Sequence, residues 1–299
     1  MRYSFAKMHG AGNDYIYMDG FHGHAVPSDP SAAAAVWSRR HFSIGADGLI
    51  LILPHPECDA EMRMFNADGS EGKMCGNGIR CVGKYLYDTG LKHQQNLKIM
   101  TKSGVRYLKV IENPETGKAS ALVVNMGRPC WDPAQIPVQT ESGQADHLTL
   151  ALDGYGTLTV DCVSMGNPHA VCFVSDVDAI NLETVGPLVE HHPAFPEGVN
   201  AEFVEVMDSH TLKFRVWERG SGETYACGTG ACASAVAAVL NGYCKHDEEI
   251  LIHLRGGDLT IVYRSDETVL MKGPAAFICD GTVDDQYINE LKENAVCRS

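Results

Sequence analysis

The chain has 299 residues, of which 44% are hydrophobic and 21% charged, a composition typical of a globular protein with room for two domains. Its 38 acidic residues outnumber the 24 basic ones, and the net charge of −14 argues against nucleic acid or an anionic membrane as a partner. No stretch approaches the roughly 18 apolar residues of a membrane span, and the first residues do not resemble a signal peptide, so we expect a cytoplasmic protein.

The first half of the chain reads as strands around two helices. The strands are predicted at residues 5–8, 15–18, 49–53, 61–65, 97–101, 105–111 and 121–125. The first two flank a glycine-rich turn at residues 9–14, where Asn13 either presents its amide to a polar ligand or holds its own backbone in an Asx turn. Asp29 and Pro30 predict the start of a helix that runs to about residue 40.

A second helix in this half follows Cys75. Ile79, Val82 and Leu86 recur at helical spacing, and Gly90 offers a stop. The loop before this helix and the helix start together read NADGSEGKMCGNGIRCVGKY, from Asn66 onward. Cys75 is therefore predicted at the helix N-terminus.

Residues 128–148 are rich in Pro, Gln, Asp and Ser and predict the crossing into the second half plus a surface loop. The second half predicts a helix over 182–190 and strands at 158–165, 170–174, 200–206, 212–217, 250–254, 259–263 and, as the final strand, 268–271. His191 and His192 precede a proline, where a surface loop is a better interpretation than a metal site. The tail is predicted to return to the first domain as a helix over 285–293.

A buried helix follows Cys227. Residues 231–240 are nearly all apolar, which is typical of a helix covered on every side, and Gly242 offers a stop. The approach to this helix, ERGSGETYACGTGAC from Glu218 onward, repeats the approach to Cys75. The two cysteines are 152 positions apart, about half the chain length. At that offset Arg63, Phe65, Glu71, Gly76, Gly78 and Gly104 match Arg215, Trp217, Glu223, Gly228, Gly230 and Gly256.

Matches at one offset across about forty positions indicate a duplicated domain. The predicted fold class is α/β (α+β), with two pseudo-symmetric domains, each a mixed or antiparallel sheet wrapped around a central helix. The predicted domains are residues 1–127 with 278–299, and residues 128–277.

The position of the two cysteines has a chemical consequence. Helix starts favour anions, so a thiol there is expected to ionise more readily and to serve as a base near neutral pH. The glycines that follow are expected to let a ligand approach the backbone closely. If Cys75 and Cys227 face each other, one takes a proton and the other gives one, as inversion at a carbon centre requires.

Three other interpretations of these cysteines are less well supported. Glycine-flanked structural thiols would not explain the symmetry. A zinc site formed with Cys81 and Cys232 lacks the spacing and the further ligands of known sites, and the eleven cysteines include no CxxC pair. A phosphate-binding glycine loop would need the lysine and hydroxyl residue that GNG and GTG lack. The odd number of cysteines indicates a reducing compartment rather than a disulfide scaffold.

At these motifs the sequence resembles the diaminopimelate epimerase family. The resemblance covers essentially the whole chain. It includes HGAGND at 9–14, GADG at 45–48, GNPH at 166–169 and NAEFVEV at 200–206, besides the two cysteine motifs. Proline racemases, which are related, carry a histidine in the first glycine motif, where this chain has Asn77.

The resemblance implies an epimerase, without pyridoxal or any other cofactor and without a metal, that interconverts L,L- and meso-2,6-diaminopimelate for lysine and cell-wall precursor synthesis. Cys75 and Cys227 would be the two catalytic acid/base residues, with Cys75 the base toward the L,L form. His169 and Glu218 would assist the thiols. The residues implied to bind substrate are Asn13, Asn66, Gly76, Asn77, Asn167, Asn200, Glu218, Arg219, Gly228 and Thr229. Within this set the backbone N–H groups of Gly76, Asn77, Gly228 and Thr229 would hold the reacting carboxylate and stabilise the carbanion-like transition state.

The chain departs from the family in one residue of the GADG motif. Many members carry glutamine where this chain has Gly48, so one hydrogen bond to the distal end of the substrate is replaced or absent. Two other functions are a racemase of the same fold with another substrate, and a binding protein that holds an amino acid without chemistry. The expected partners are a small amino-acid substrate and a second copy of the chain in a homodimer.

Overall fold

The computed structural model describes residues 1–141 and 143–285. The chain divides into two compact units. Unit 1 contains Met1–Val124 together with residues 274–285, and unit 2 contains Asn125–Gly273. The divisions predicted from the sequence fall after residue 127 and before residue 278. Within the described residues, no helix is long and apolar enough to cross a membrane.

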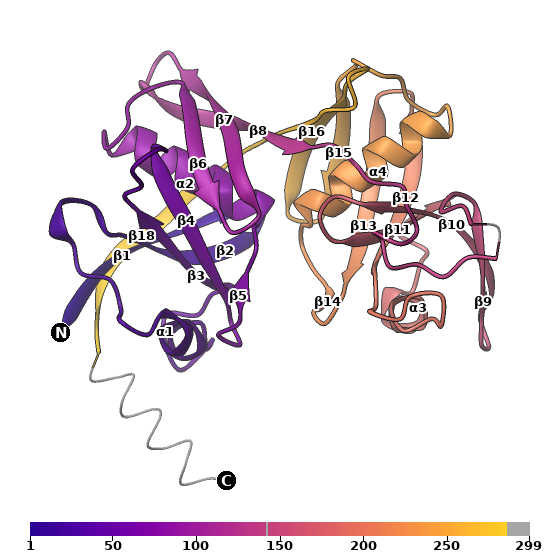
Figure 1. Ribbon diagram of the computed structural model, residues 1–299, viewed down its shortest axis with the longest axis horizontal. Helices are drawn as coiled ribbons and strands as arrows, with labels where there is room; N and C mark the ends of the chain where they lie inside the picture. The colour runs from indigo at the N-terminus through magenta and orange to yellow at the C-terminus, as the bar shows by residue number, and fades with distance from the viewer. Residues whose placement is uncertain (142, 286–299) are drawn as a thin grey trace, which may run out of the picture. The chain divides into compact units, whose positions relative to one another are not determined.

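Unit 1 is a mixed sheet with two helices and one 3-10 turn (Figure 1). Its helical elements are η1 (Phe21–Gly23), α1 (Pro30–Trp37) and α2 (Gly76–Asp88). Its strands are β1 (Arg2–Gly10), β2 (Asn13–Asp19), β3 (Gly48–Leu53), β4 (Ala60–Asn66), β5 (Glu71–Gly72), β6 (Asn96–Thr101), β7 (Gly104–Asn113), β8 (Lys118–Gly127) and β18 (Ala276–Asp284). β2–β3 and β4–β6 pair in parallel, and the other neighbours pair antiparallel.

Unit 2 repeats this arrangement. Its helices are α3 (Leu182–Glu190) and α4 (Gly228–Leu240). Its strands are β9 (Leu148–Leu152), β10 (Gly156–Ser164), β11 (Pro168–Val174), β12 (Asn200–Asp208), β13 (Thr211–Glu218), β14 (Gly222–Glu223), β15 (Ile250–Leu254), β16 (Gly257–Tyr263) and β17 (Val269–Gly273). Here β11–β12 and β13–β15 are the parallel pairs.

The two units match strand for strand, and each pairing that both units contain is parallel in both or antiparallel in both. β1 to β8 correspond in order to β10 to β17, α1 corresponds to α3, and α2 to α4. Even the register repeats: Phe65 pairs with Glu71 in unit 1, and Trp217 pairs with Glu223 in unit 2. The predicted pseudo-symmetric fold is therefore confirmed. β18 on β1 and β9 on β10 are the additions that distinguish the units.

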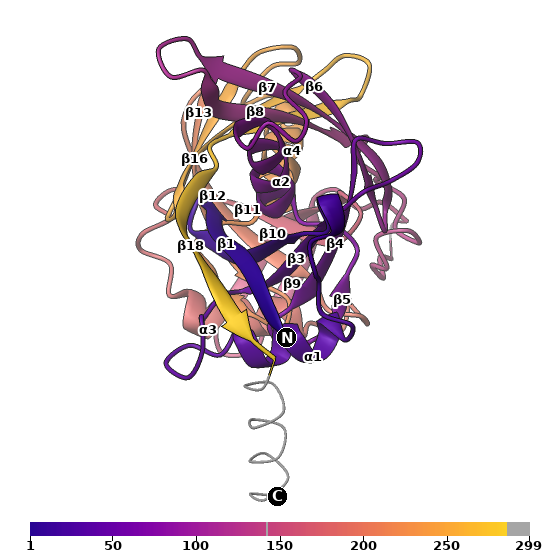
Figure 2. The same cartoon turned by 90° about the vertical axis from the view of Figure 1, so that its left-hand side faces the viewer.

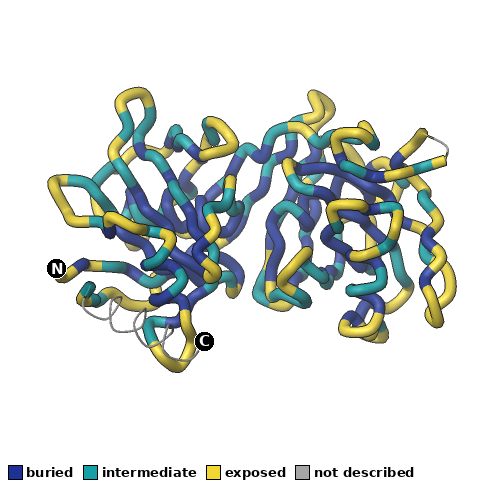
Figure 3. The backbone as a smooth tube through the Cα atoms, turned by 60° about the horizontal axis from the view of Figure 1, so that its bottom comes forward, coloured by how far each residue is buried: buried dark blue, intermediate teal, exposed yellow. Residues whose placement is uncertain are grey.

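Each unit is built around its longer helix. α2, labelled in Figure 2, packs on β1, β2 and β7 of unit 1, and α4 packs on β10 to β13, β16 and β17 of unit 2. Nearly every residue of α4 is buried, because its alanines, valines and glycine let strands approach from all sides. A second core in each unit lies under the shorter helix, around Trp37 in unit 1 and Phe203 in unit 2. Figure 3 colours the buried stretches of the backbone dark blue.

The structure corrects several element predictions. The strand predicted at residues 268–271 corresponds to β17, which is not the final strand. The final strand is β18, which pairs antiparallel with β1 from Arg2 to His9. The tail does return to unit 1 as expected, but it does so as this strand, and the helix predicted over 285–293 lies almost entirely outside the described residues. α1 ends at Trp37 rather than near residue 40, although Asp29 caps it by accepting from Ala32 N–H at 3.0 Å, as the sequence predicts.

Candidate active site: two equivalent cysteine sites

Cys75 is the N-cap of α2 and Cys227 is the N-cap of α4. Each sulfur accepts from the N–H three residues on: Gly78 at 3.3 Å and Gly230 at 3.4 Å. The loops are extended at the cysteines, so each thiol caps its helix as a serine or aspartate side chain would. The two sites are thus the same local structure formed twice.

The residues after each cysteine lie in the first helical turn. Gly76 and Asn77 open α2, and Gly228 and Thr229 open α4, where backbone N–H groups lack intrahelical acceptors and point toward the positive end of the dipole. Such a terminus suits a carboxylate. The Thr229 hydroxyl also lies 3.5 Å from the Cys227 sulfur.

In unit 1 a hydrogen-bonded network surrounds Cys75. The thiol donates to Asn13 Oδ1 at 3.3 Å, and Asn77 Nδ2 approaches the same oxygen at 3.4 Å. The NH2 group of the same Asn13 amide donates to Asp47 Oδ2 at 2.7 Å. Because a carboxylate accepts only from the NH2 group, Asp47 determines that the Asn13 oxygen faces the thiol. Arg40 in turn contacts Asp47 at 3.2 Å.

A buried arginine lies under the start of α2. Arg80 is fully buried and donates to the carbonyls of Gly76 and Pro274, both at 3.1 Å, and to Asn77 Oδ1 at 2.9 Å. Its guanidinium therefore holds the first turn of the helix and the Asn77 side chain in one place. In unit 2 the equivalent position is Cys232.

Asn66 does not join this network. It ends β4 and closes the turn to β5, where its amide donates to the Ser70 hydroxyl at 3.0 Å and its backbone N–H bonds the Ser70 carbonyl. In the structure Asn66 thus has a turn-forming role.

The environment of Cys227 corrects one chemical expectation. Burial raises the pKa of the Cys227 thiol well above its usual value, and the charges of Glu218 and Glu202 raise it further. The Thr229 hydroxyl and the Gly230 N–H at the helix start lower this pKa but do not outweigh burial. The sequence predicted an easily ionised thiol at both helix starts. At Cys227 the loss of solvation prevails, so the neutral thiol is favoured at neutral pH.

His169 lies in a buried chain of hydrogen bonds in unit 2. Its Nδ1 is 2.7 Å from Glu202 Oε1, and its Nε2 is 3.0 Å from Asn167 Oδ1. Both His169 and Glu202 are fully buried. Burial raises the pKa of Glu202 to about 7, against the lowering effect of His169.

The remaining predicted residues of unit 2 are arranged along the end of β12 and β13. Asn200 donates to the Pro168 carbonyl at 2.8 Å and accepts from Arg219 N–H at 3.0 Å. The Arg219 guanidinium donates to the Glu197 carbonyl at 2.9 Å. Glu218 accepts from the Thr224 hydroxyl at 2.5 Å. Asn200 therefore ties the Gly-Asn-Pro-His turn to the loop that carries Glu218 and Arg219.

The glycine at the third position after each cysteine, Gly78 or Gly230, is explained by packing rather than by ligand approach. A Cβ at Gly78 would lie 2.6 Å from Ile50 Cδ1, and one at Gly230 would lie 2.7 Å from Glu202 Oε1. The helix starts thus lie directly on β3 and β12, and a side chain at either glycine would displace the end of the Ile50 or Glu202 side chain. The expected access for a ligand is therefore not the reason for these two glycines.

Gly48 also has a steric reason. A Cβ there would lie 2.1 Å from the Phe65 carbonyl oxygen and 2.8 Å from the Tyr15 ring. Position 48 matches Asn200 in unit 2 at the same register of β3 on β4 and β12 on β13. The backbone of this chain thus closes the space that a larger residue would need.

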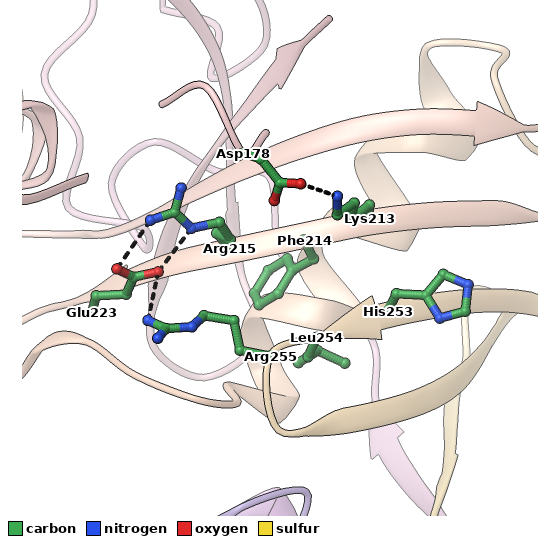
Figure 4. Close-up of a pocket in the computed structure, with 8 residues that line it drawn as sticks. All are labelled: Asp178, Lys213, Phe214, Arg215, Glu223, His253, Leu254 and Arg255. Carbon is green, nitrogen blue, oxygen red and sulfur yellow. Dashed lines mark hydrogen bonds and ion pairs between the residues drawn. The ribbon is translucent and has the colours of Figure 1, made fainter. Parts of the chain in front are cut away.

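The ion pair Arg63–Glu71 recurs as Arg215–Glu223, with the same atoms 2.8 Å apart in both units. In unit 2 these residues line a pocket of about 380 Å³, shown in Figure 4, whose other charged residues are Asp178, Lys213, His253 and Arg255. Arg255 adds a second contact to Glu223 at 3.0 Å, and Lys213 pairs with Asp178. None of the predicted site residues lines this pocket. Its lysine and its two arginines each pair with a carboxylate, and we assign the pocket a structural role.

No group of three or more His, Cys, Asp or Glu side chains suited to a metal occurs in the part of the chain that the structure describes. His191 and His192 lie in the turn that follows α3. The cysteines within residues 1–141 and 143–285 form no disulfide.

Three residues of these networks were not singled out from the sequence: Asp47, Arg80 and Glu202. Each had a signal that could have been used. Arg80 and Glu202 are charged residues inside otherwise buried stretches, and Asp47 lies in the GADG motif. A charge in a buried segment is costly unless it has a specific partner, so such positions indicate networks.

Solved structures with low sequence identity share this fold. A phenazine biosynthesis protein of the PhzF family from Bacillus anthracis aligns over 95% of this chain and 99% of its own, with a TM-score of 0.68 and 16% identity. A probable proline racemase from Agrobacterium radiobacter K84, with bound carbonate, aligns over 94% of this chain and 92% of its own, with a TM-score of 0.71 and 14% identity. The duplicated fold around two central helices is therefore the one common to these proteins.

Sequence relatives define the family. The sequence model described as diaminopimelate epimerase matches residues 5–131 and 161–278. The diaminopimelate epimerase of Acetivibrio thermocellus is 49% identical over 96% of this chain and 99% of its own. That of Bacillus licheniformis is 46% identical over 93% of this chain and 97% of its own. This chain belongs to the diaminopimelate epimerase family.

Proposed function

We propose that this chain is an isomerase that interconverts L,L- and meso-2,6-diaminopimelate, and so serves lysine and cell-wall precursor synthesis. The observation that carries the proposal is the pair of cysteine N-caps at equivalent helix starts, in a chain nearly half identical to named diaminopimelate epimerases along its whole length. A racemase of another amino acid is disfavoured by the presence of Asn167, Asn200 and Arg219, which the family uses on the distal end of its substrate.

In the proposed mechanism each unit contributes one thiol to the same α-carbon. One cysteine, as thiolate, removes the α-proton. The other, as neutral thiol, delivers a proton to the opposite face, and no oxidant, metal or cofactor is consumed. The raised pKa of Cys227 suits it to carry the proton that is delivered, and we assign Cys75, after its own thiol has lost its proton, as the base toward the L,L form.

The helix starts supply the electrostatic stabilisation. The α-carboxylate gains negative charge as the proton leaves, and the N–H groups of Gly76, Asn77, Gly228 and Thr229 are oriented to receive it. Arg219 is assigned to the distal carboxylate and Glu218 to an ammonium group. Asn13, Asn66, Asn77, Asn167 and Asn200 complete the proposed set of substrate contacts, and His169 and Glu218 are assigned to assist the thiols.

The proposal is tested by incubating the reduced protein with L,L-diaminopimelate in D₂O and following the α-proton by NMR, without any added cofactor. Exchange together with appearance of the meso isomer is the expected result. Cys75→Ala and Cys227→Ala should each lower the rate by at least about a hundredfold, because general acid/base groups contribute that much or more. Cys279→Ala, at an exposed cysteine of β18, is the matched control.

Two results would count against the mechanism. Full activity in either cysteine variant would remove the two-thiol account. Binding of diaminopimelate without any exchange would instead favour a binding protein. We also propose the cytoplasm as the location, because the described cysteines form no disulfide, and a homodimer as the assembly. Sedimentation of the purified chain tests the assembly.

A further inference from the structure

A fully buried carboxylate in unit 2 has no part in the mechanism above. Glu202 lies in β12 with no exposed surface, and its Oε2 has no hydrogen-bond partner within the described residues. Its Oε1 lies beside the start of α4, where a Cβ on Gly230 would come within 2.7 Å. Burying an acidic group in this way is costly, so a specific use is expected for it.

The duplicated fold shows that packing does not require this carboxylate. At the equivalent position of unit 1 the residue is Ile50, whose Cδ1 lies beside Gly78 as Glu202 Oε1 lies beside Gly230. The equivalent of His169 in unit 1 is Tyr15. An apolar residue thus fills the same place in the same fold. Glu202 must therefore have a role in unit 2 that other residues perform in unit 1.

The two units differ in the groups that orient the equivalent asparagines, Asn13 and Asn167. In unit 1, Asp47 accepts from the Asn13 NH2 group and so turns the Asn13 oxygen toward Cys75. In unit 2, His169 Nε2 faces the Asn167 oxygen at 3.0 Å, which leaves the Asn167 NH2 group on the other side. The asparagines therefore present opposite ends of their amides, an acceptor in unit 1 and a donor in unit 2.

The number of protons in the hydrogen-bonded series Asn167–His169–Glu202 depends on Glu202. The Asn167 oxygen can only accept, so His169 Nε2 must carry a proton. The 2.7 Å contact between His169 Nδ1 and Glu202 Oε1 then holds one further proton, on either atom. In both cases Nε2 remains a donor. Without a partner at Nδ1, a neutral imidazole could place its proton there instead and release Asn167.

The charged and titratable groups that face Glu202 come from four elements. They are His169 on β11, Glu218 on β13, Cys162 on β10 and Cys227 at the start of α4. Burial raises the pKa of Glu202 to about 7, which is consistent with a proton shared with His169.

We propose that Glu202 is a positioning residue: it keeps His169 protonated at Nε2, and His169 turns the Asn167 amide so that its NH2 group meets an acceptor oxygen of the substrate. This inference rests on the proposed function for the identity of the substrate. It assigns Glu202 a role in substrate affinity, through two intervening side chains, rather than in proton transfer.

The first test separates affinity from turnover. Glu202→Ala should raise KM for L,L-diaminopimelate by about tenfold or more, the effect of a lost charge-assisted hydrogen bond, with a smaller loss in kcat. Glu202→Gln can donate to Nδ1 and should keep KM within about threefold of the wild type. Glu205→Gln, the same change on the same strand, is the control, since glutamine can still accept from Val177 N–H. Equal KM values for the alanine variant and the wild type, or a glutamine variant as impaired as alanine, would overturn the proposal.

The second test does not depend on activity. ¹⁵N-labelled histidine in the wild-type protein, with His169 assigned by loss of its signals in His169→Gln, should show a protonated Nε2 from pH 5 to pH 9. An unprotonated Nε2 would overturn the proposal, whatever the substrate. Absence of epimerisation with a protonated Nε2 would count against the proposed function but not against the positioning of Asn167.

Discussion

The Cys75 thiol donates a hydrogen bond to the amide oxygen of Asn13 over 3.3 Å. The orientation of that amide is not a property of Asn13 alone, since Asp47 holds its NH2 group at 2.7 Å. The catalytic proposal for Cys75 therefore extends to a carboxylate one residue before Gly48, in a motif that the sequence analysis connected only with the distal end of the substrate.

Replacement of Asp47 should impair the site without unfolding it. In Asp47→Ala the Asn13 amide is free to rotate, so we expect kcat/KM to fall by about tenfold, as for loss of a hydrogen bond to a charged group. Steady-state kinetics measure this effect. Arg40→Met removes the ion pairs of Arg40 with Asp47 and with Asp14, and a loss as large in that variant would mean that these ion pairs, not the Asn13 contact, are responsible.

The thiol of Cys227 should resist alkylation at neutral pH. Burial and the neighbouring carboxylates raise its pKa, so the reactive thiolate is scarce until the pH approaches that raised value. Iodoacetamide labelling followed by mass spectrometry should show Cys227 modified at least about tenfold more slowly than exposed Cys279 at pH 7.5.

A variant can distinguish the two possible causes of slow alkylation at Cys227, a raised pKa of the thiol and restricted access of the reagent. Glu218→Gln removes one of the charges that raise the pKa of Cys227, so labelling of Cys227 should become faster at the same pH. An unchanged rate in this variant would indicate that access, rather than ionisation, limits the reaction.

Glu202 should make stability depend on pH. Its folded pKa of about 7 lies above the unfolded value of 4.5, so the folded protein binds the proton more tightly. Stability is then fully present below about pH 4.5 and declines as pH rises toward 7, by up to about 1.4 kcal/mol per pH unit. Thermal unfolding of Glu202→Gln, which cannot ionise, should lack this decline. A decline of the same steepness in both proteins would assign it to other groups.

Gly48 should not tolerate a side chain. Gly48→Ala places a Cβ 2.1 Å from a backbone oxygen, and we expect it to lower the free energy of unfolding by about 1–3 kcal/mol, the usual cost of overpacking. Denaturant unfolding gives this value. Gly281→Ala, another strand glycine, meets only the Phe5 ring at 3.0 Å and should cost less. Equal costs would mean that β3 and β4 separate easily.

Local sequence patterns were sufficient for most of the fold. The helix after each cysteine and the repeat at 152 residues follow from periodicity, glycine stops and matched motifs, all of which are local signals. β9 and β18 were missed because their pairing partners lie elsewhere: β9 falls at the edge of a polar, proline-rich stretch, and β18 pairs with the first strand of the chain. Pairing between distant segments leaves little trace in either segment alone.

The sequence on its own identified the two cysteines, their place at helix starts and the family, because these depend on residue types at short spacing. It could not give the ionisation of Cys227, the orientation of Asn13 and Asn167, or the steric need for glycine at position 48. Those properties arise from groups far apart in the chain: Glu202 beside the α4 start, Asp47 beside Asn13, and the Phe65 carbonyl beside Gly48. Desolvation, hydrogen-bond direction and overlap of atoms depend on distances in space, and folding alone sets these distances.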